Sequence, residues 1–168
     1  PSGRAMAEPM LADLVEGLHQ HLTMERNANT QYFANSVWFA ERELRGFARF
    51  FKNEATSELE HANKFADYLI ARGQSVLLEE LKSPIQTWKD LEEIYSYSFQ
   101  MEADVTTSLQ QLYALAERSS DVRTTVFLDP IVEAQTSSED EFAYLLGRVR
   151  FSENQPSALL IIDGELKV

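Results

Sequence analysis

The sequence predicts an all-α protein: a four-helix bundle with one long crossover and a short fifth helix at its C-terminal end. Apolar residues recur three and four positions apart through four long segments, which is the spacing of one helix face. The 168 residues include only 6 Gly and 5 Pro, too few to punctuate many short strands. This length favours a single domain over residues 1–168. Within it we expect an N-terminal extension (1–9), the bundle (11–153) and the short helix (156–166).

The first two helices are predicted over residues 11–39 and 44–72, joined by a short turn that makes them an antiparallel hairpin. The inward stripe of the first helix consists of Leu11, Leu14, Val15, Leu18, Leu22, Tyr32 and Ser36. The stripe of the second consists of Phe47, Phe50, Phe51, Phe65, Tyr68 and Leu69. Gly73 follows the second helix, at the position where glycine commonly ends a helix.

A long crossover is predicted after Gly73. Residues 74–86 have no helical period and contain Ser83-Pro84, so we expect an extended connection that lets the third helix lie parallel to the second. The stretch from Thr87 to Asp90 has the spacing of a capping box, with Asp where Glu or Gln is preferred. It predicts a third helix from there to about residue 117, with inward residues Leu91, Ile94, Tyr95, Leu109, Leu112 and Leu115.

The fourth helix is expected after Ser119-Ser120-Asp121, which ends the third helix and caps the next. Its inward residues are Val126, Phe127, Ile131, Phe142, Leu145, Leu146 and Val149. Pro130 interrupts this pattern and should kink the helix or remove one hydrogen bond. Residues 157–166 predict the short helix, which is too apolar to be left in water. We therefore expect it to be buried against symmetry-related copies of the chain.

The composition excludes several classes of function. A net charge of −12 argues against nucleic acid as a partner, because phosphate binding needs Lys and Arg. The charge fits a protein that attracts cations, or simply a soluble acidic surface. With no cysteine, the chain forms no thiolate zinc site and no iron–sulfur cluster, which suits the cytoplasm. No run of roughly eighteen apolar residues predicts a membrane span, and the first residues lack a signal-peptide core.

Six polar side chains occupy inward positions on the four helices. They are Glu25, Glu58, His61, Glu102, Gln135 and Glu139. Each alone is more often a structural side chain, such as a paired acid or a hydrogen-bonded core histidine. Together, with no Lys or Arg clearly placed to pair with them, they favour a bound cation, because burying an unpaired carboxylate costs several kcal/mol. A purely structural polar core is the alternative.

The residue types narrow the choice of metal. Carboxylates with one imidazole and no sulfur suit iron or manganese better than structural zinc. Glu58 has two oxygens and can bridge two ions, with Glu25 and His61 completing the first site. Glu102 would hold the second ion, and Gln135 or Glu139 is available to complete its coordination. The second site then keeps open positions for water and oxygen, as reactive metal sites do.

Two further residues lie one or two turns from these ligands. Tyr32 is two turns after Glu25 on the same face. It could donate an electron or hydrogen-bond an oxygen species, or it is a core aromatic residue. Glu54 is one turn before Glu58 and could be a transit ligand for ions that pass through the site, or a solvated acid.

On these motifs the chain resembles ferritin over nearly its whole length, and it is most similar to the bacterial non-haem ferritins with a ferroxidase centre. The motifs that carry the resemblance are Glu25 with Tyr32, Glu58 with His61, Trp88 with Glu102 and Ser108-Leu109, and the segment from Val132 to Gln135.

The resemblance implies a shell of 24 identical subunits that stores ferric mineral. It implies that Fe(II) is oxidised by O2 at an intra-subunit centre with two iron ions per subunit. The catalytic residues that it implies are Glu25, Tyr32, Glu58, His61, Glu102 and Gln135. Asp129 and Glu133, expected at the beginning of the fourth helix, would lie near the three-fold pores, where acids draw Fe(II) inward. A solvated helix start is the alternative. No haem is expected, because Leu59 stands where bacterioferritins place their haem-binding methionine.

Three other functions compete with this one. A smaller, dodecameric ferritin-like cage that protects nucleic acid usually has its iron site between subunits and a basic tail, whereas this chain is acidic with a complete intra-subunit set. A di-iron oxidoreductase that detoxifies iron or oxidants would carry a second Glu-x-x-His pair. A metal-free bundle would act as an assembly or binding module. The mass of the assembly and the consumption of O2 on addition of Fe(II) distinguish these alternatives.

Overall fold

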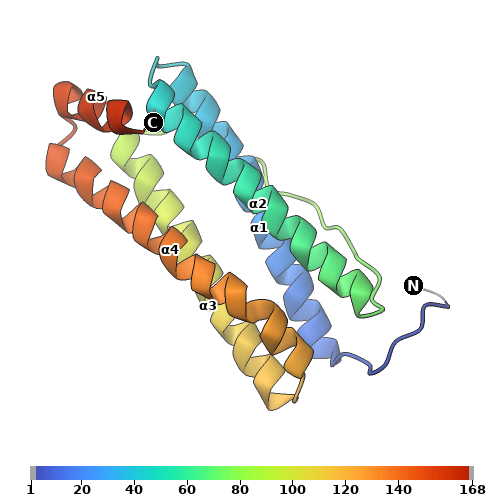
Figure 1. The fold of residues 1–168 in the computed structure, drawn as a ribbon. Coiled ribbons are helices and arrows are strands. Elements are labelled where there is room, and N and C mark those ends of the chain that lie inside the picture. The colour runs from blue at the N-terminus through green and yellow to red at the C-terminus, as the bar shows by residue number, and fades with distance from the viewer. Residues whose placement is uncertain (1–2, 167–168) are drawn as a thin grey trace.

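The computed structural model describes residues 3–166, which form five α-helices and contain no strand (Figure 1). The helices are α1 (Ala12–Ala40), α2 (Arg45–Ala71), α3 (Leu91–Arg118), α4 (Val122–Ser152) and α5 (Pro156–Glu165). The predicted all-α bundle with a short fifth helix is confirmed. Most of the predicted boundaries lie within one or two residues of the observed ones, because the apolar period ends where each helix ends.

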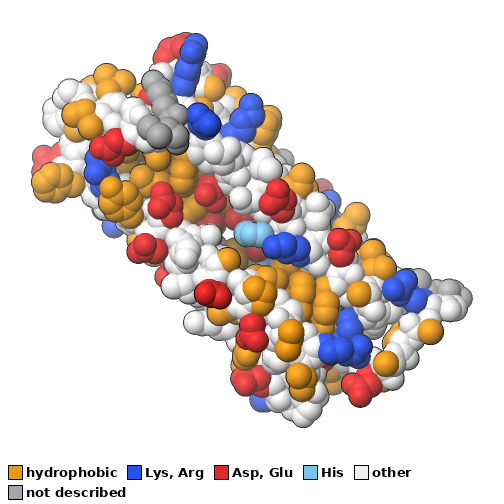
Figure 2. Space-filling view, in the orientation of Figure 1, with side chains coloured by type: hydrophobic (Ala, Val, Ile, Leu, Met, Phe, Trp, Pro, Cys, Tyr) orange, Lys and Arg blue, Asp and Glu red, His pale blue; other side chains and the backbone are white. Residues whose placement is uncertain are grey.

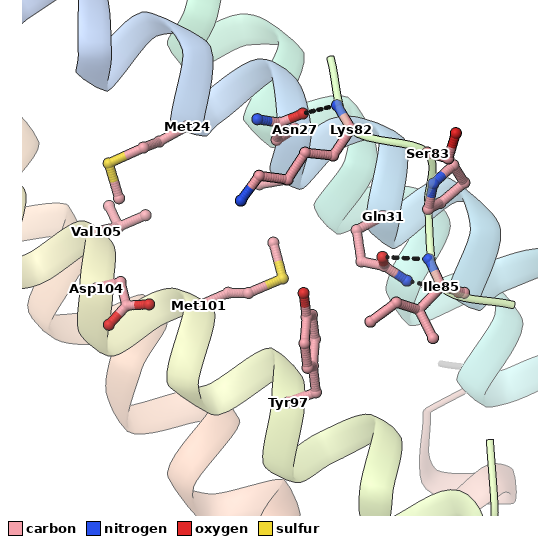
Figure 3. Close-up of a pocket in the computed structure, with 12 residues that line it drawn as sticks. Met24, Asn27, Gln31, Lys82, Ser83, Ile85, Tyr97, Met101, Asp104 and Val105 are labelled. Carbon is pink, nitrogen blue, oxygen red and sulfur yellow. Dashed lines mark hydrogen bonds between the residues drawn. The ribbon is translucent and has the colours of Figure 1, made fainter. Parts of the chain in front are cut away.

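The chain direction follows from the lengths of the connections. Short turns make α1–α2 and α3–α4 antiparallel hairpins, and the long segment between α2 and α3 runs the length of the bundle, so α3 is parallel to α2 (Figure 1). Side chains of α1 hold this segment. Asn27 Oδ1 accepts the Lys82 N–H at 2.9 Å, and Gln31 exchanges two hydrogen bonds with the backbone of Ile85 (Figure 3). These bonds replace the backbone pairing that an irregular segment lacks.

The start of α3 differs from the prediction at Thr87. The N-cap is Asp90, whose Oδ1 accepts the Glu93 N–H at 2.9 Å, while Glu93 Oε2 accepts the Lys89 N–H at 3.1 Å. Asp90 and Glu93 place the preferred acids at both ends of the capping pattern, so they determine the start of the helix in place of Thr87. The predicted cap of α4 is confirmed, because Asp121 Oδ1 accepts the Thr124 N–H.

Two residues predicted to face inward are exposed. Leu11 is 46% exposed because it is the N-cap of α1 and precedes the helix. Val126 is 62% exposed. The inward face of α4 runs instead through Thr124, Leu128 and Gln135, which leaves Val126 on the outer side. The helix continues through Pro130 without a break.

The pore prediction placed Asp129 and Glu133 at the beginning of the fourth helix. Because α4 begins at Val122, both residues lie further along it, beyond its first turn. Both are exposed.

The helix α5 packs across the ends of α2 and α4. Leu44, the N-cap of α2, offers no side-chain oxygen, and Asp163 of α5 takes that role by accepting the Phe47 N–H at 2.9 Å. The contact requires a glycine at position 46, because a Cβ there would lie 1.8 Å from the Asp163 carbonyl oxygen. The short helix is therefore part of the bundle's own end.

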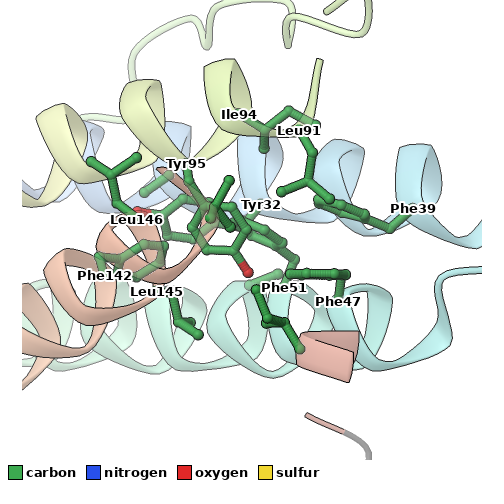
Figure 4. Packing of buried hydrophobic residues seen from close by; sticks show 14 residues of the cluster. Tyr32, Phe39, Phe47, Phe51, Leu91, Ile94, Tyr95, Phe142, Leu145 and Leu146 are labelled. Carbon is green, nitrogen blue, oxygen red and sulfur yellow. The ribbon is translucent and has the colours of Figure 1, made fainter. Parts of the chain in front are cut away.

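The apolar core is divided into two clusters along the bundle axis. One, shown in Figure 4, includes Phe39, Phe47, Phe51, Tyr95 and Phe142. The other includes Leu14, Leu18, Phe65, Leu109 and Leu128. On every long helix a short, largely polar stretch separates the residues of one cluster from those of the other, and polar side chains from the four stretches lie near one another. No helix within residues 3–166 is long and apolar enough to cross a membrane.

Candidate metal centre

Each long helix contributes a buried polar side chain to the layer between the two apolar clusters. The contributors are Glu25 on α1, Glu58 on α2, Glu102 on α3 and Gln135 on α4. The three glutamates are 1%, 4% and 2% exposed. Within residues 3–166 no Lys or Arg forms an ion pair with them. Buried carboxylates without a Lys or Arg partner need protonated neighbours, protons of their own or a metal ion to offset their charge.

The first group consists of Glu25, Glu58 and His61. His61 Nδ1 lies 3.6 Å from Glu25 Oε2 and 3.4 Å from Glu58 Oε2, too far for good hydrogen bonds. Both Oε2 atoms are buried without a hydrogen-bond partner. Two ligand atoms each about 2.1 Å from one tetrahedral ion would be about 3.4 Å apart. The three side chains therefore fit a shared cation better than they fit one another.

The second group consists of Glu54, Glu58 and Glu102, which can bring one carboxylate oxygen each within 4.8 Å of the others. Glu58 belongs to both groups. Glu102 is held on both sides, because Tyr32 Oη donates to its Oε1 at 2.7 Å and Gln135 Nε2 donates to its Oε2 at 2.8 Å. The centre is thus two acidic groups with one common carboxylate.

The proton distribution in the first group follows from its burial. Burial disfavours the charged form of Glu25, but polar contacts with Glu58 and two histidines outweigh this effect and lower the pKa of Glu25. Burial and the neighbouring Glu25 raise the pKa of Glu58. The carboxylates of Glu25 and Glu58 raise the pKa of His61 to about 10. One ionised carboxylate thus lies between protonated neighbours, whose protons take the place of a cation.

The carboxyl groups of the second group also have raised pKa values, which favour their neutral forms. Burial and the charge of Glu102 raise the pKa of Glu54 to about 7. Burial also raises the pKa of Glu102, although hydrogen bonds from Gln135 and Tyr32 oppose the rise. Burial is the main reason that the pKa of Tyr32 lies well above its usual range. The phenol therefore stays a hydrogen-bond donor to Glu102.

The structure brings together most of the residues that the sequence singled out: Glu25, Glu54, Glu58, His61, Glu102, Gln135 and Tyr32. Glu54, predicted as a possible transit ligand, lies in the second group itself, next to Glu58 and Glu102. Glu139 lies outside both groups, and its Oε2 accepts the hydroxyl of Thr106 at 2.6 Å. Asp129 and Glu133 are exposed and also lie outside both groups.

His21 was not among the predicted site residues, although it is fully buried and bonded to Glu25. The signal was present in the sequence, because His21 precedes Glu25 by four residues and so lies on the same helix face.

The first group opens to the surface between α2 and α4. A cavity of about 210 Å³ reaches Glu25, His61 and Gln135, and its other lining residues include Phe127, Ile131 and Ala134. Figure 2 shows this face, with a histidine side chain at the surface next to a basic side chain and with acidic side chains around them; Lys64 also lines the cavity. The cavity gives small molecules access to the centre.

Comparisons with known proteins agree with the fold described above. The family model described as "Ferritin-like domain" matches residues 15–152. A bacterial non-heme ferritin of Staphylococcus haemolyticus is 28% identical, over 92% of this chain and 93% of that protein. A bacterial non-heme ferritin of Escherichia coli O157:H7 is 24% identical over the same shares. An open-pore ferritin of the archaeon Archaeoglobus fulgidus superimposes with a TM-score of 0.91 and 25% identity, covering 96% of this chain and 99% of that one.

Proposed function

Because the chain belongs to the ferritin family, whose members store iron and oxidise it, we propose that its acidic centre binds two Fe(II) ions and oxidises them with O2. The observation that supports this proposal most directly is that Glu58 belongs to both groups of potential metal ligands. One carboxylate with two oxygens holds two ions close enough to give an electron each to the same O2 molecule. Single-ion sites do not need such a shared ligand.

Each side chain has a part in the proposed reaction. Glu25 and His61 bind the first Fe(II) ion together with one oxygen of Glu58, and Glu102 and Glu54 bind the second together with the other oxygen. Gln135 and Tyr32 fix Glu102 in place through their hydrogen bonds. Glu54 is only half-buried, which suits an ion that enters or leaves the second position.

The proton balance supports the same role. Glu58 and His61 hold protons in the absence of metal, and they release them when Fe(II) takes their place. Removal of these protons leaves the carboxylates free to stabilise the greater charge of the ferric product.

The proposal extends to the assembly. A shell of 24 subunits in the cytoplasm would enclose the ferric mineral, with exposed Asp129 and Glu133 near its entry pores. The exposed apolar surface of α5 supports burial against other copies of the chain. The mass of the native assembly tests this part, and a monomer or a dodecamer would contradict it.

A matched pair of variants tests the reaction. Glu58→Ala should abolish the rapid phase of Fe(II) oxidation, because both sites lose the shared ligand. Glu60→Ala changes an exposed acid of the same helix outside both groups and should leave that phase unchanged. Stopped-flow absorbance and O2 consumption measure the rate. If Glu58→Ala and the unchanged protein oxidised Fe(II) at the same rate in the rapid phase, the proposal would be wrong.

A further inference from the structure

His21 stands behind Glu25 on the side away from the proposed metal ions. It is fully buried, and its ring packs on Phe65 with centroids 4.5 Å apart. Its Nε2 lies 2.9 Å from Glu25 Oε1, and its Nδ1 lies 2.8 Å from the hydroxyl oxygen of Ser108 on α3. The ring thus connects a carboxylate on α1 to a hydroxyl on the neighbouring helix.

The carboxylate of Glu25 determines which ring nitrogen of His21 carries a proton toward the metal centre. An ionised carboxylate only accepts hydrogen bonds, so Nε2 must carry the proton and donate it to Glu25. Nδ1 forms the second hydrogen bond with the Ser108 hydroxyl, which can donate or accept. This arrangement satisfies both ring nitrogens in a site without access to solvent.

The bond from His21 distinguishes the two oxygens of Glu25. Oε1 is occupied by the ring, whereas Oε2 is buried, has no hydrogen-bond partner and lies nearest to His61 Nδ1. A glutamate side chain loses rotamer freedom when it binds an ion, and a fixed donor removes part of that entropy before binding. The donor therefore prepares Oε2 for the metal.

We propose that His21 is a positioning residue of the metal centre: its Nε2–H holds Glu25 so that Oε2 faces the first Fe(II) ion, and the hydrogen bond between Nδ1 and Ser108 fixes the orientation of the ring. The inference rests on the proposed function, because it assigns a supporting group to that same site. Groups in this position commonly account for about 10- to 100-fold in metal affinity. A purely structural histidine would contribute only to packing and stability.

Two amide substitutions separate these roles. In His21→Gln the amide nitrogen comes near the place of Nε2 and can still donate to Glu25. In His21→Asn it comes near the place of Nδ1, within reach of Ser108 but short of Glu25. Both variants lose the ring that packs on Phe65, so each controls for the packing loss of the other.

The measurement is Fe(II) binding without O2, followed by calorimetry, together with the visible absorption spectrum of Co(II) bound in place of Fe(II). We expect His21→Gln to bind Fe(II) almost as tightly as the unchanged protein, and His21→Asn to lose about 10- to 100-fold at the first site. The Co(II) spectrum should change in His21→Asn only. Equal affinities in both variants, whether both reduced or both unchanged, would overturn the assignment.

Two controls keep the result interpretable. If His21→Asn does not fold, Ser108→Ala decides, because this half-buried hydroxyl can be removed with little loss of packing. Weaker Fe(II) binding supports the proposal, and unchanged binding overturns it. The unchanged protein and Glu58→Ala are measured alongside. If they bind Fe(II) equally, the proposed metal centre itself is wrong, whereas a difference between them with no effect at His21 contradicts only the positioning role.

Discussion

At the scale of single residues, the centre has more carboxylates than negative charges. Glu25 is ionised, whereas burial and neighbouring carboxylates keep protons on Glu58 and His61. The protein without metal therefore avoids the repulsion that several buried anions would produce. The same protons must leave when a metal ion binds, because only the deprotonated groups are ligands.

This exchange predicts that the affinity for Fe(II) rises with pH. The pKa values of Glu58 and His61 are raised, so both groups hold a proton at neutral pH, and lower proton concentration favours its replacement by the metal. Fe(II) added without O2 should release a proton from each, measurable with an indicator dye in weak buffer. Glu58→Gln should release fewer protons. An affinity that stays constant between about pH 6 and pH 8 would contradict the prediction.

At the scale of the helices, the junction of α5 with α2 predicts a specific weakness. Gly46→Ala places a methyl group against the Asp163 carbonyl oxygen, so α5 must move and Asp163 loses its bond to Phe47 N–H. We expect a loss of about 1–3 kcal/mol in stability, measurable as a lower melting temperature. Gly147→Ala is the control, because a Cβ at this helical position meets nothing within 4 Å. Equal melting temperatures for the two variants would argue against a close α2–α5 contact.

The helices and the centre were predictable to different degrees. The period of apolar residues predicts the helices, and the breaks in that period predict Glu25, Glu58 and Glu102 as inward acids. The cap of α2 by Asp163 was not predictable, because the two ends of that bond are 116 residues apart in sequence. His21 was missed because a histidine on an apolar face looks like an ordinary core residue until its partner on α3 is known.

At the scale of the whole molecule, the end of the bundle that carries α5 presents apolar surface. Phe151 is 91% exposed, and Leu160 and Ile161 are 59% and 63% exposed. A groove of about 610 Å³ lies between α4 and α5. An exposed apolar surface of this kind supports the proposed contact with other copies of the chain.

We therefore expect Ile161→Glu to impair assembly without unfolding the bundle. The new charge would be buried in a contact between copies, which is costly, yet it points away from the core of the single chain. Native mass spectrometry should show smaller species than for the unchanged protein, with an unchanged helical circular dichroism spectrum. Gln110→Glu, at an exposed polar position of α3, serves as the control. An Ile161→Glu variant that assembles normally would place the contact elsewhere.

The division of the apolar core into two clusters has a consequence for local unfolding of the bundle. Amide hydrogens exchange most slowly with solvent where buried apolar contacts around them are densest. Here the layer between the two apolar clusters consists of buried acids, so in the iron-free chain the amides of this layer should exchange faster than those within the clusters. Two bound ions would link all the helices that supply their ligands and so stabilise this layer. Slower amide hydrogen exchange around Glu58 and Glu102 after addition of the metal would show this effect.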